Sequence, residues 1–217
     1  MKNRTIIFAL RLILWSFAAY PVCLVAAEFN ALVVDNNNLP LENTVIALIP
    51  TQQPDYNHLP TAVMDQRENM FVPHVLAIRT NTQVRFPNSD DVRHHVYSFS
   101  PAKKFELRLY HGLSADPVVF DKPGTVVLGC NIHDSMLAYI YVVDTEYFAV
   151  TDQSGQLKIN APAGAYQIQV FHPRLQEAFT PVSLQLAEGK NRQQQIQLTK
   201  LNRVEAEAPA DELSTLF

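Results

Sequence analysis

The chain has 217 residues, with 17 lysines and arginines against 21 aspartates and glutamates, and its formal net charge is −4 at pH 7. This excess of negative charge argues against a nucleic-acid partner, because phosphate backbones are bound mainly by lysine and arginine. The length allows one large β domain or two small ones.

The first 27 residues have the pattern of a secretory signal peptide. Lys2, Arg4 and Arg11 flank an apolar run that ends in the small residues Val25-Ala26-Ala27, directly before the polar Glu28. Small residues at this place are typical of signal-peptidase cleavage. The alternative is an uncleaved anchor, since a run of this length could just span a bilayer. We predict cleavage after Ala27, export to the periplasm, and no stable membrane anchor after cleavage.

Cleavage changes both the charge and the cysteine count. Without residues 1–27 the chain keeps 14 basic and all 21 acidic residues, a charge of −7, and loses Cys23. Cys130 is then the only cysteine, so no intrachain disulfide can form. A lone cysteine in an oxidising compartment indicates a partner chain, a reactive thiol or a metal ligand, and the alternative is an inert buried side chain.

The rest of the chain reads as β-strands. Apolar residues alternate with a period of two at 45–49, 157–159 and 166–170, as in half-buried strands. Turn signals rich in Asn, Pro, Gly and Asp separate such stretches, at 36–38, 87–90, 122–124, 152–155, 162–164 and 188–191. Only residues 61–70 are compatible with a turn or two of helix. The pattern predicts an all-β protein built from sandwiches or barrels.

The two ends of the chain resemble one family. The sequence ALVVDNNNLPLENTVIALIP looks like the opening hairpin of a carboxypeptidase-regulatory-like, or transthyretin-like, β-sandwich, and YFAVTDQSGQLKINAPAGAYQIQVFHP looks like its later strands. The resemblance implies that residues 28–60 and 145–201 form one sandwich, with residues 61–144 inserted between its strands or packed beside them. Residues 202–217 are rich in Ala, Glu and Pro without apolar periodicity, which predicts a mobile tail.

A metal-ligand pattern occurs in the sequence GCNIHDSM. Cys130, His133 and Met136 follow a predicted strand, TVVLGC, and precede another, LAYIYVV, so we expect a short loop that presents a thiol, an imidazole and a thioether. These soft or borderline donors suit copper better than magnesium or calcium. A blue-copper site needs a second imidazole in the plane of the metal.

The second imidazole is expected from the adjacent histidines of VRHHVYSFS. Successive side chains on a strand point to opposite faces, so only one of the two can face a shared metal. His94 shares its face with Val92 and Val96, while His95 shares its face with polar or aromatic neighbours. We therefore predict His94 as the ligand.

Residues 70–143 resemble a cupredoxin. The ligand order His, Cys, His, Met is the family's order, and two residues on each side of His133 match the short loop of amicyanin. Where relatives usually have His-Asn-Val, this chain has His94-His95-Val96, which leaves the role of His95 open. Over both parts of the chain the resemblance is to exported cupredoxin-like proteins named methylamine utilisation proteins, a label that does not itself assign a role with methylamine.

The resemblance implies a cupredoxin-like Greek-key sandwich beside a small transthyretin-like one, and one copper ion in a type 1 site. Its metal ligands would be His94, Cys130, His133 and Met136, with Met136 the least secure. It further implies single-electron transfer to an unidentified redox partner protein and no enzymatic activity.

Four alternatives stay open: a copper carrier or storage protein, a zinc site, a hydrolase with Cys130 as nucleophile, and an exported binding sandwich without metal. His58, His74, His111 and His172 are expected outside the metal site, as surface or hydrogen-bonding residues.

Overall fold

The computed structural model describes residues 26–52, 54, 56, 58–113 and 116–203. These residues form seventeen strands, β1 to β17, in five sheets, which confirms the all-β prediction. The described part contains no helix long and apolar enough to cross a membrane. The predicted signal peptide up to residue 25, and the predicted tail from residue 204, lie outside the described residues.

Strands from both ends of the chain enclose one hydrophobic core, called here the terminal core. Its two sheets have the strand orders β14-β1-β17 and β13-β2-β15-β16. The strands are β1 (Ala27–Asp35), β2 (Val45–Pro50), β13 (Phe148–Val150), β14 (Gln156–Ala161), β15 (Gly164–Phe171), β16 (Val182–Leu186) and β17 (Asn191–Leu198). The buried residues are Ala27, Phe29, Ala31, Val33, Leu41, Ile46, Leu48, Leu157, Ile159, Ala161, Tyr166, Ile168, Val170, Leu184, Leu186, Ile196 and Leu198.

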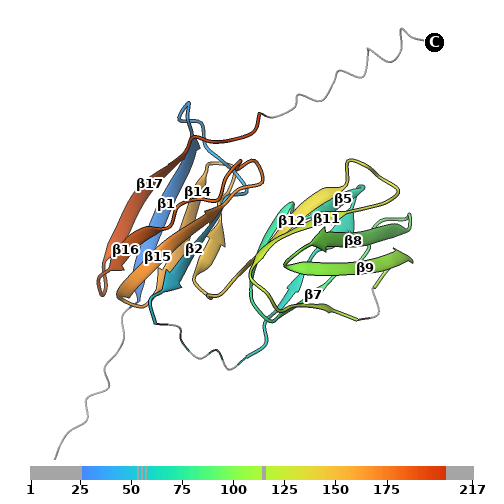
Figure 1. Ribbon diagram of the computed structural model, residues 1–217, viewed down its shortest axis with the longest axis horizontal. Helices are drawn as coiled ribbons and strands as arrows, with labels where there is room; N and C mark the ends of the chain where they lie inside the picture. The colour runs from blue at the N-terminus through green and yellow to red at the C-terminus, as the bar shows by residue number, and fades with distance from the viewer. Residues whose placement is uncertain (1–25, 53, 55, 57, 114–115, 204–217) are drawn as a thin grey trace, which may run out of the picture.

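Long-range pairing closes this first unit. β1 runs parallel to β17, with Glu28 opposite Asn191, and antiparallel to β14, with Ala27 opposite Ala161. The blue and red strands therefore lie side by side in Figure 1. The beginning and end of the described chain are joined in one sheet.

The middle of the chain encloses a second core, called here the central core. A five-stranded sheet of order β6-β12-β11-β8-β9 and a three-stranded sheet of order β10-β7-β3 contribute to this part, with the hairpin β4-β5 beside them. The strands are β3 (Thr61–Val63), β4 (Asp65–Arg67), β5 (Met70–Val72), β6 (Val75–Arg79), β7 (Thr82–Arg85), β8 (His94–Ser100), β9 (Lys103–Tyr110), β10 (Val118–Phe120), β11 (Gly124–Gly129) and β12 (Leu137–Val143). The buried residues are Met64, Phe71, Ile78, Val84, Phe86, Val96, Phe120, Val126, Leu128, Cys130, Met136, Ala138, Ile140 and Val142.

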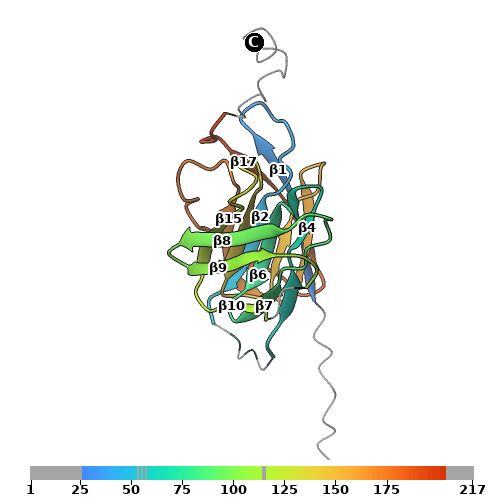
Figure 2. The same cartoon turned by 90° about the vertical axis from the view of Figure 1, so that its right-hand side faces the viewer.

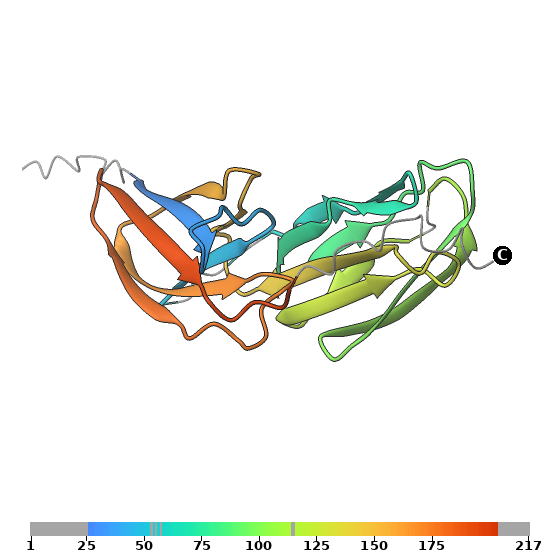
Figure 3. The ribbon, with the colours of Figure 1, turned by 90° about the horizontal axis from the view of Figure 1, so that it is seen from above.

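The two units lie end to end (Figure 3), and Figure 2 looks onto β8 and β9 at the far end of the second unit. An aromatic contact joins the units: the rings of Tyr141 and Phe171 are stacked, with centroids 4.8 Å apart and planes 9° apart. Two separate cores agree with two small domains. The boundaries at residues 60/61 and 144/145, and the transthyretin-like character of the first unit, stay predictions.

The helical turn considered at residues 61–70 is wrong. These residues form β3, β4 and the start of β5, in which Arg67 pairs with Met70 across a two-residue loop. The loop residues Glu68 and Asn69 both have positive φ, 53° and 57°, as a tight type I′ hairpin requires. Antiparallel pairing of Asp65–Arg67 with Met70–Val72 supplies the backbone hydrogen bonds of this segment, so it is a hairpin and not a helix.

His172 is a buried histidine outside the predicted metal loop. It directly follows β15, and its Nδ1 accepts a hydrogen bond from the Arg174 backbone N–H at 3.1 Å. Burial, assisted by the Arg174 charge, lowers the pKa of His172 to about 4. The folded protein therefore holds this imidazole in its neutral form at neutral pH.

A pH dependence of stability follows. In the unfolded chain the pKa of His172 lies near its ordinary value of about 6.5, so between about pH 6.5 and 4 the unfolded state binds a proton that the folded state does not. Lowering the pH through this window should lower the free energy of unfolding by up to about 3 kcal/mol. Urea denaturation at several pH values should show this slope in the wild type and lose it in His172→Gln; equal slopes in both proteins would refute the assignment.

Candidate metal centre

The predicted ligand loop joins two antiparallel neighbours in the five-stranded sheet. β11 ends at Gly129 and β12 begins at Leu137, and these two residues lie opposite each other in the register. The Met136 backbone N–H donates to the His133 carbonyl at 3.0 Å, which closes the last turn of the loop. The loop is thus short, and both of its ends are fixed by the same sheet.

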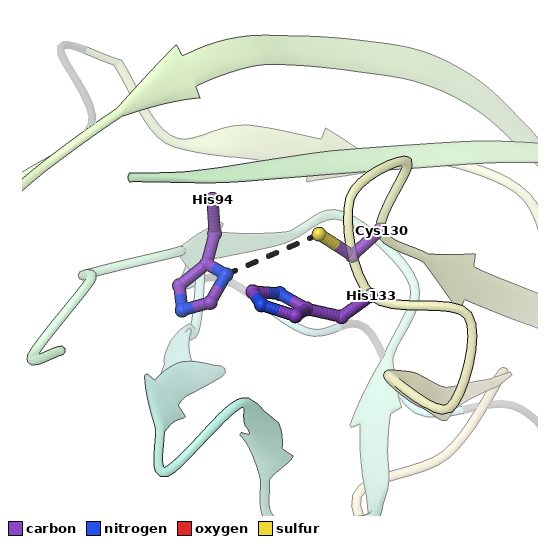
Figure 4. Close-up of side chains that lie close together, drawn as sticks. All are labelled: His94, Cys130 and His133. Carbon is purple, nitrogen blue, oxygen red and sulfur yellow. Dashed lines mark hydrogen bonds between the residues drawn. The ribbon is translucent and has the colours of Figure 1, made fainter. Parts of the chain in front are cut away.

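Three of the predicted side chains come together (Figure 4). Ligand atoms of His94, Cys130 and His133 all lie within 4.8 Å of one another. The Cys130 Sγ is 4.0 Å from the His94 Nδ1, and the two imidazole centroids are 5.0 Å apart. His94 is 0% exposed and Cys130 4%, whereas His133 is half-buried. The cluster is therefore closed on its inner side and reaches the surface through His133.

The structure places the two adjacent histidines in different surroundings. His94 is the first residue of β8 and points toward Cys130, while the His95 Nε2 lies 3.0 Å from Glu106 Oε1 on β9. The His95 ring also packs against Tyr97, with centroids 5.6 Å apart. Alternation along the strand separates the two imidazoles, so only His94 joins the cluster.

Asp90 fixes which nitrogen of His94 carries a proton. Its Oδ2 lies 2.7 Å from the His94 Nε2. Burial alone would raise the pKa of Asp90, but hydrogen bonds from the Asn69 N–H, His94 and the Glu68 N–H outweigh it and lower that pKa below its ordinary value. The carboxylate is thus an anionic acceptor, which favours the His94 tautomer with its hydrogen on Nε2 and its Nδ1 lone pair toward the Cys130 sulfur.

His133 supplies a second nitrogen suited to a metal. Its Nδ1 is buried and has no hydrogen-bond partner among the described residues. Buried polar atoms are nearly always hydrogen-bonded, because leaving one unpaired costs free energy. A metal ion bound between His94, Cys130 and His133 would give this nitrogen a partner. The residues present therefore fit a bound metal.

Met136 is placed differently from the other three. It is 1% exposed and belongs to the same central core as Cys130. It is the last residue before β12, which holds its backbone at the end of the ligand loop. This position is compatible with an axial ligand and also with ordinary core packing.

The remaining histidines lie outside the cluster, as expected. His58 contacts Glu146 at 3.2 Å, His74 packs edge-on against Tyr139, His111 is exposed and His172 is buried beside β15. The sequence prediction missed the role of Asp90. The signal available was the Asn88-Ser89-Asp90 turn four residues before His94, but spacing alone did not show that the carboxylate turns back onto the imidazole.

Solved structures of several copper proteins are similar to parts of the chain. A copper-containing nitrite reductase from Thermus scotoductus SA-01 is 24% identical over 52% of this chain, which spans only 28% of the reductase, with a TM-score of 0.37. A purple cupredoxin from Nitrosopumilus maritimus is 19% identical over 39% of this chain and 99% of its own, with a TM-score of 0.34. An amicyanin mutant is 14% identical over 47% of this chain and 100% of its own, with a TM-score of 0.35.

No family model matches the chain, and no curated protein matches its sequence. All three TM-scores are below 0.5, so the function proposed below rests on the chain's own side chains.

Proposed function

We propose that the protein binds one copper ion in a type 1 site and carries single electrons; His94, Cys130 and His133 would hold the ion, with Met136 as a further, weaker ligand. The observation that supports the proposal is the buried cluster of two imidazoles and one thiol within 4.8 Å. Copper would supply the one-electron change between its two oxidation states. The side chains of the protein would hold the ion in a fixed position and leave one side of the site accessible to a partner.

The donor set favours copper over other metals. Magnesium and calcium prefer oxygen donors, whereas thiolate and imidazole are soft or borderline ligands. Zinc accepts the same donors, and it gives no visible colour with a thiolate. A change of Met136 would retune a copper site rather than abolish it, because a thioether would be the weakest of the four ligands.

The chain's part in electron transfer is to hold one ligand geometry. His94 is anchored by β8 and Asp90, and Cys130 directly follows β11 in the closed part of the site. Side chains positioned by rigid strands move little. A geometry that stays the same in both oxidation states lowers the reorganisation needed for each electron.

Burial argues against a cysteine hydrolase. A nucleophilic thiol must meet its substrate, and Cys130 is only 4% exposed. Asp134, the acid nearest in sequence to His133, is exposed and has no hydrogen bond to either histidine of the cluster among the described contacts. We therefore propose an electron-transfer protein and not an enzyme, exported to the periplasm as the N-terminal sequence predicts.

Electron transfer and copper carriage differ in what happens to the metal. The enclosed positions of His94 and Cys130 favour retention, so the loaded protein should pass through repeated cycles of chemical oxidation and reduction and keep its copper. Metal content and visible absorption after each cycle, with and without a copper(I) chelator, would check this. Loss of copper to the chelator in the first cycles would favour a carrier or storage role instead.

The surface around His133 is the expected docking surface for the redox partner. Leu137, next to the ligand loop, is 42% exposed, and Ile132 is exposed within the loop. Apolar contacts here would bring the partner close to the His133 edge. We expect Leu137→Ser to slow electron exchange by about tenfold, within the span that single interface changes produce.

The matched control is Val182→Ser, because Val182 is equally exposed, at 42%, but lies on β16 in the other unit. Electron self-exchange between oxidised and reduced protein, followed by NMR line broadening, measures the rate. Equal rates in Leu137→Ser and the control would rule out docking at the ligand loop.

A further inference from the structure

Asp90 is tied to three donors from two separate segments. Its Oδ2 contacts the His94 Nε2 at 2.7 Å and accepts the Asn69 backbone N–H at 3.0 Å, and its Oδ1 accepts the Glu68 backbone N–H at 2.5 Å. The side chain is only 15% exposed. Both carboxylate oxygens are therefore engaged, and the group is not an ordinary surface charge.

The backbone around Asp90 is itself held in place. The Asp90 N–H donates to the Asn88 Oδ1 at 3.0 Å, and the Asn88 side-chain amide donates to the carbonyls of Val92 and Tyr110. Asn88 is buried. On the other side, the positive φ angles of Glu68 and Asn69 form the hairpin tip whose two N–H groups meet the carboxylate. The carboxylate thus has a defined position before any metal binds.

An anion on the outer nitrogen of a metal-binding imidazole has a known effect. It fixes the tautomer and ring orientation and makes the ligating nitrogen more basic. It also adds negative charge near the metal, and a buried charge is screened less than an exposed one. Both effects favour copper(II), which carries more positive charge than copper(I).

We infer that Asp90 is a positioning residue that sets the reduction potential of the site by holding His94 with its Nδ1 toward the metal and by stabilising copper(II). This inference rests on the proposed copper function. The described part of the chain shows no such carboxylate for His133, whose side chain has no ion pair. The two imidazoles would therefore contribute unequally to the copper.

The test compares Asp90→Asn with Asp91→Asn in the copper-loaded protein. Asparagine keeps a hydrogen-bond acceptor at position 90 and removes the charge, while Asp91 is the exposed neighbour and controls for general loss of charge. We expect Asp90→Asn to lower the preference for copper(II) over copper(I) by about tenfold, which raises the reduction potential by about 59 mV for one electron. Asp91→Asn should leave the potential near the wild-type value, and equal potentials in the two variants would overturn the inference.

A second readout separates this inference from the proposed function. Nitrogen NMR of the copper-free protein reports which imidazole nitrogen of His94 is protonated, and we expect Nε2–H in the wild type and a weakened preference in Asp90→Ala. If a copper site forms but neither its reduction potential nor the His94 tautomer changes in the Asp90 variants, the role of Asp90 is overturned and the proposed copper function stands. A His94 tautomer that depends on Asp90, in a protein that forms no copper–thiolate site, would overturn the proposed function and with it the role of Asp90 toward copper.

Discussion

Replacing His94 with glutamine should weaken copper binding by more than about 100-fold, since even residues that only support a ligand typically cost 10–100-fold. His94 is fully buried, and its Nδ1 lies 4.0 Å from the Cys130 sulfur. Glutamine cannot place an equivalent nitrogen at that point. It would also leave the Asp90 carboxylate without its imidazole partner.

His95→Gln is the matched control for this change. His95 is the next residue, is also buried, and has its Nε2 directed to Glu106 on β9. Copper competition with a chelator of known affinity measures both variants. The structure predicts a large loss for His94→Gln and near wild-type affinity for His95→Gln, and the opposite order would show that the wrong imidazole has been assigned to the metal.

We expect a loss of about 3–5 kcal/mol in the free energy of unfolding for Phe29→Ala and for Phe120→Ala, because each removes a buried phenylalanine ring. The two changes affect different cores. Phe29 lies in the terminal core and Phe120 in the central core, and both are fully buried. Because Cys130 and Met136 belong to the central core, only Phe120→Ala should weaken copper binding as well.

Calorimetry with and without copper tests this separation. A ligand stabilises only the unit that binds it, by about 2.7 kcal/mol at a concentration 100 times its Kd. Copper should therefore shift the unfolding transition that Phe120→Ala lowers and leave the transition that Phe29→Ala lowers. A single transition, shifted equally by copper in both variants, would contradict the predicted division at residues 60/61 and 144/145.

The grouping of His94, Cys130 and His133 could be predicted because the strand alternation and the loop spacing on which the prediction depends can both be read from local sequence. Alternation on a strand separated His94 from His95, and the spacing of Cys130 and His133 between two apolar strands placed both on one short loop. The distance between residues 94 and 130 in sequence is bridged by β8 and β11 of one sheet, paired at Tyr97 and Gly129. The cupredoxin resemblance supplied the expectation that His94 and Cys130 bind the same metal ion.

Other features depend on contacts that no local pattern reports. The parallel pairing of β1 with β17 joins residues more than 150 positions apart and follows from burial of the terminal core. The β4-β5 hairpin was missed because Glu68 and Asn69 lack the glycine that usually marks such a turn. The link between Asp90 and His94 depends on the fold of residues 88–92 and on that same hairpin tip.

A copper titration of the purified protein, read by visible absorption and electron paramagnetic resonance beside Cys130→Ala, tests the central claim most directly. We predict an intense thiolate-to-copper band that saturates at one equivalent and is missing in Cys130→Ala, because Cys130 is the thiol next to both imidazoles. A wild-type protein that shows no such band, while Cys130 still reacts with an alkylating agent in the presence of copper, would contradict the type 1 copper site.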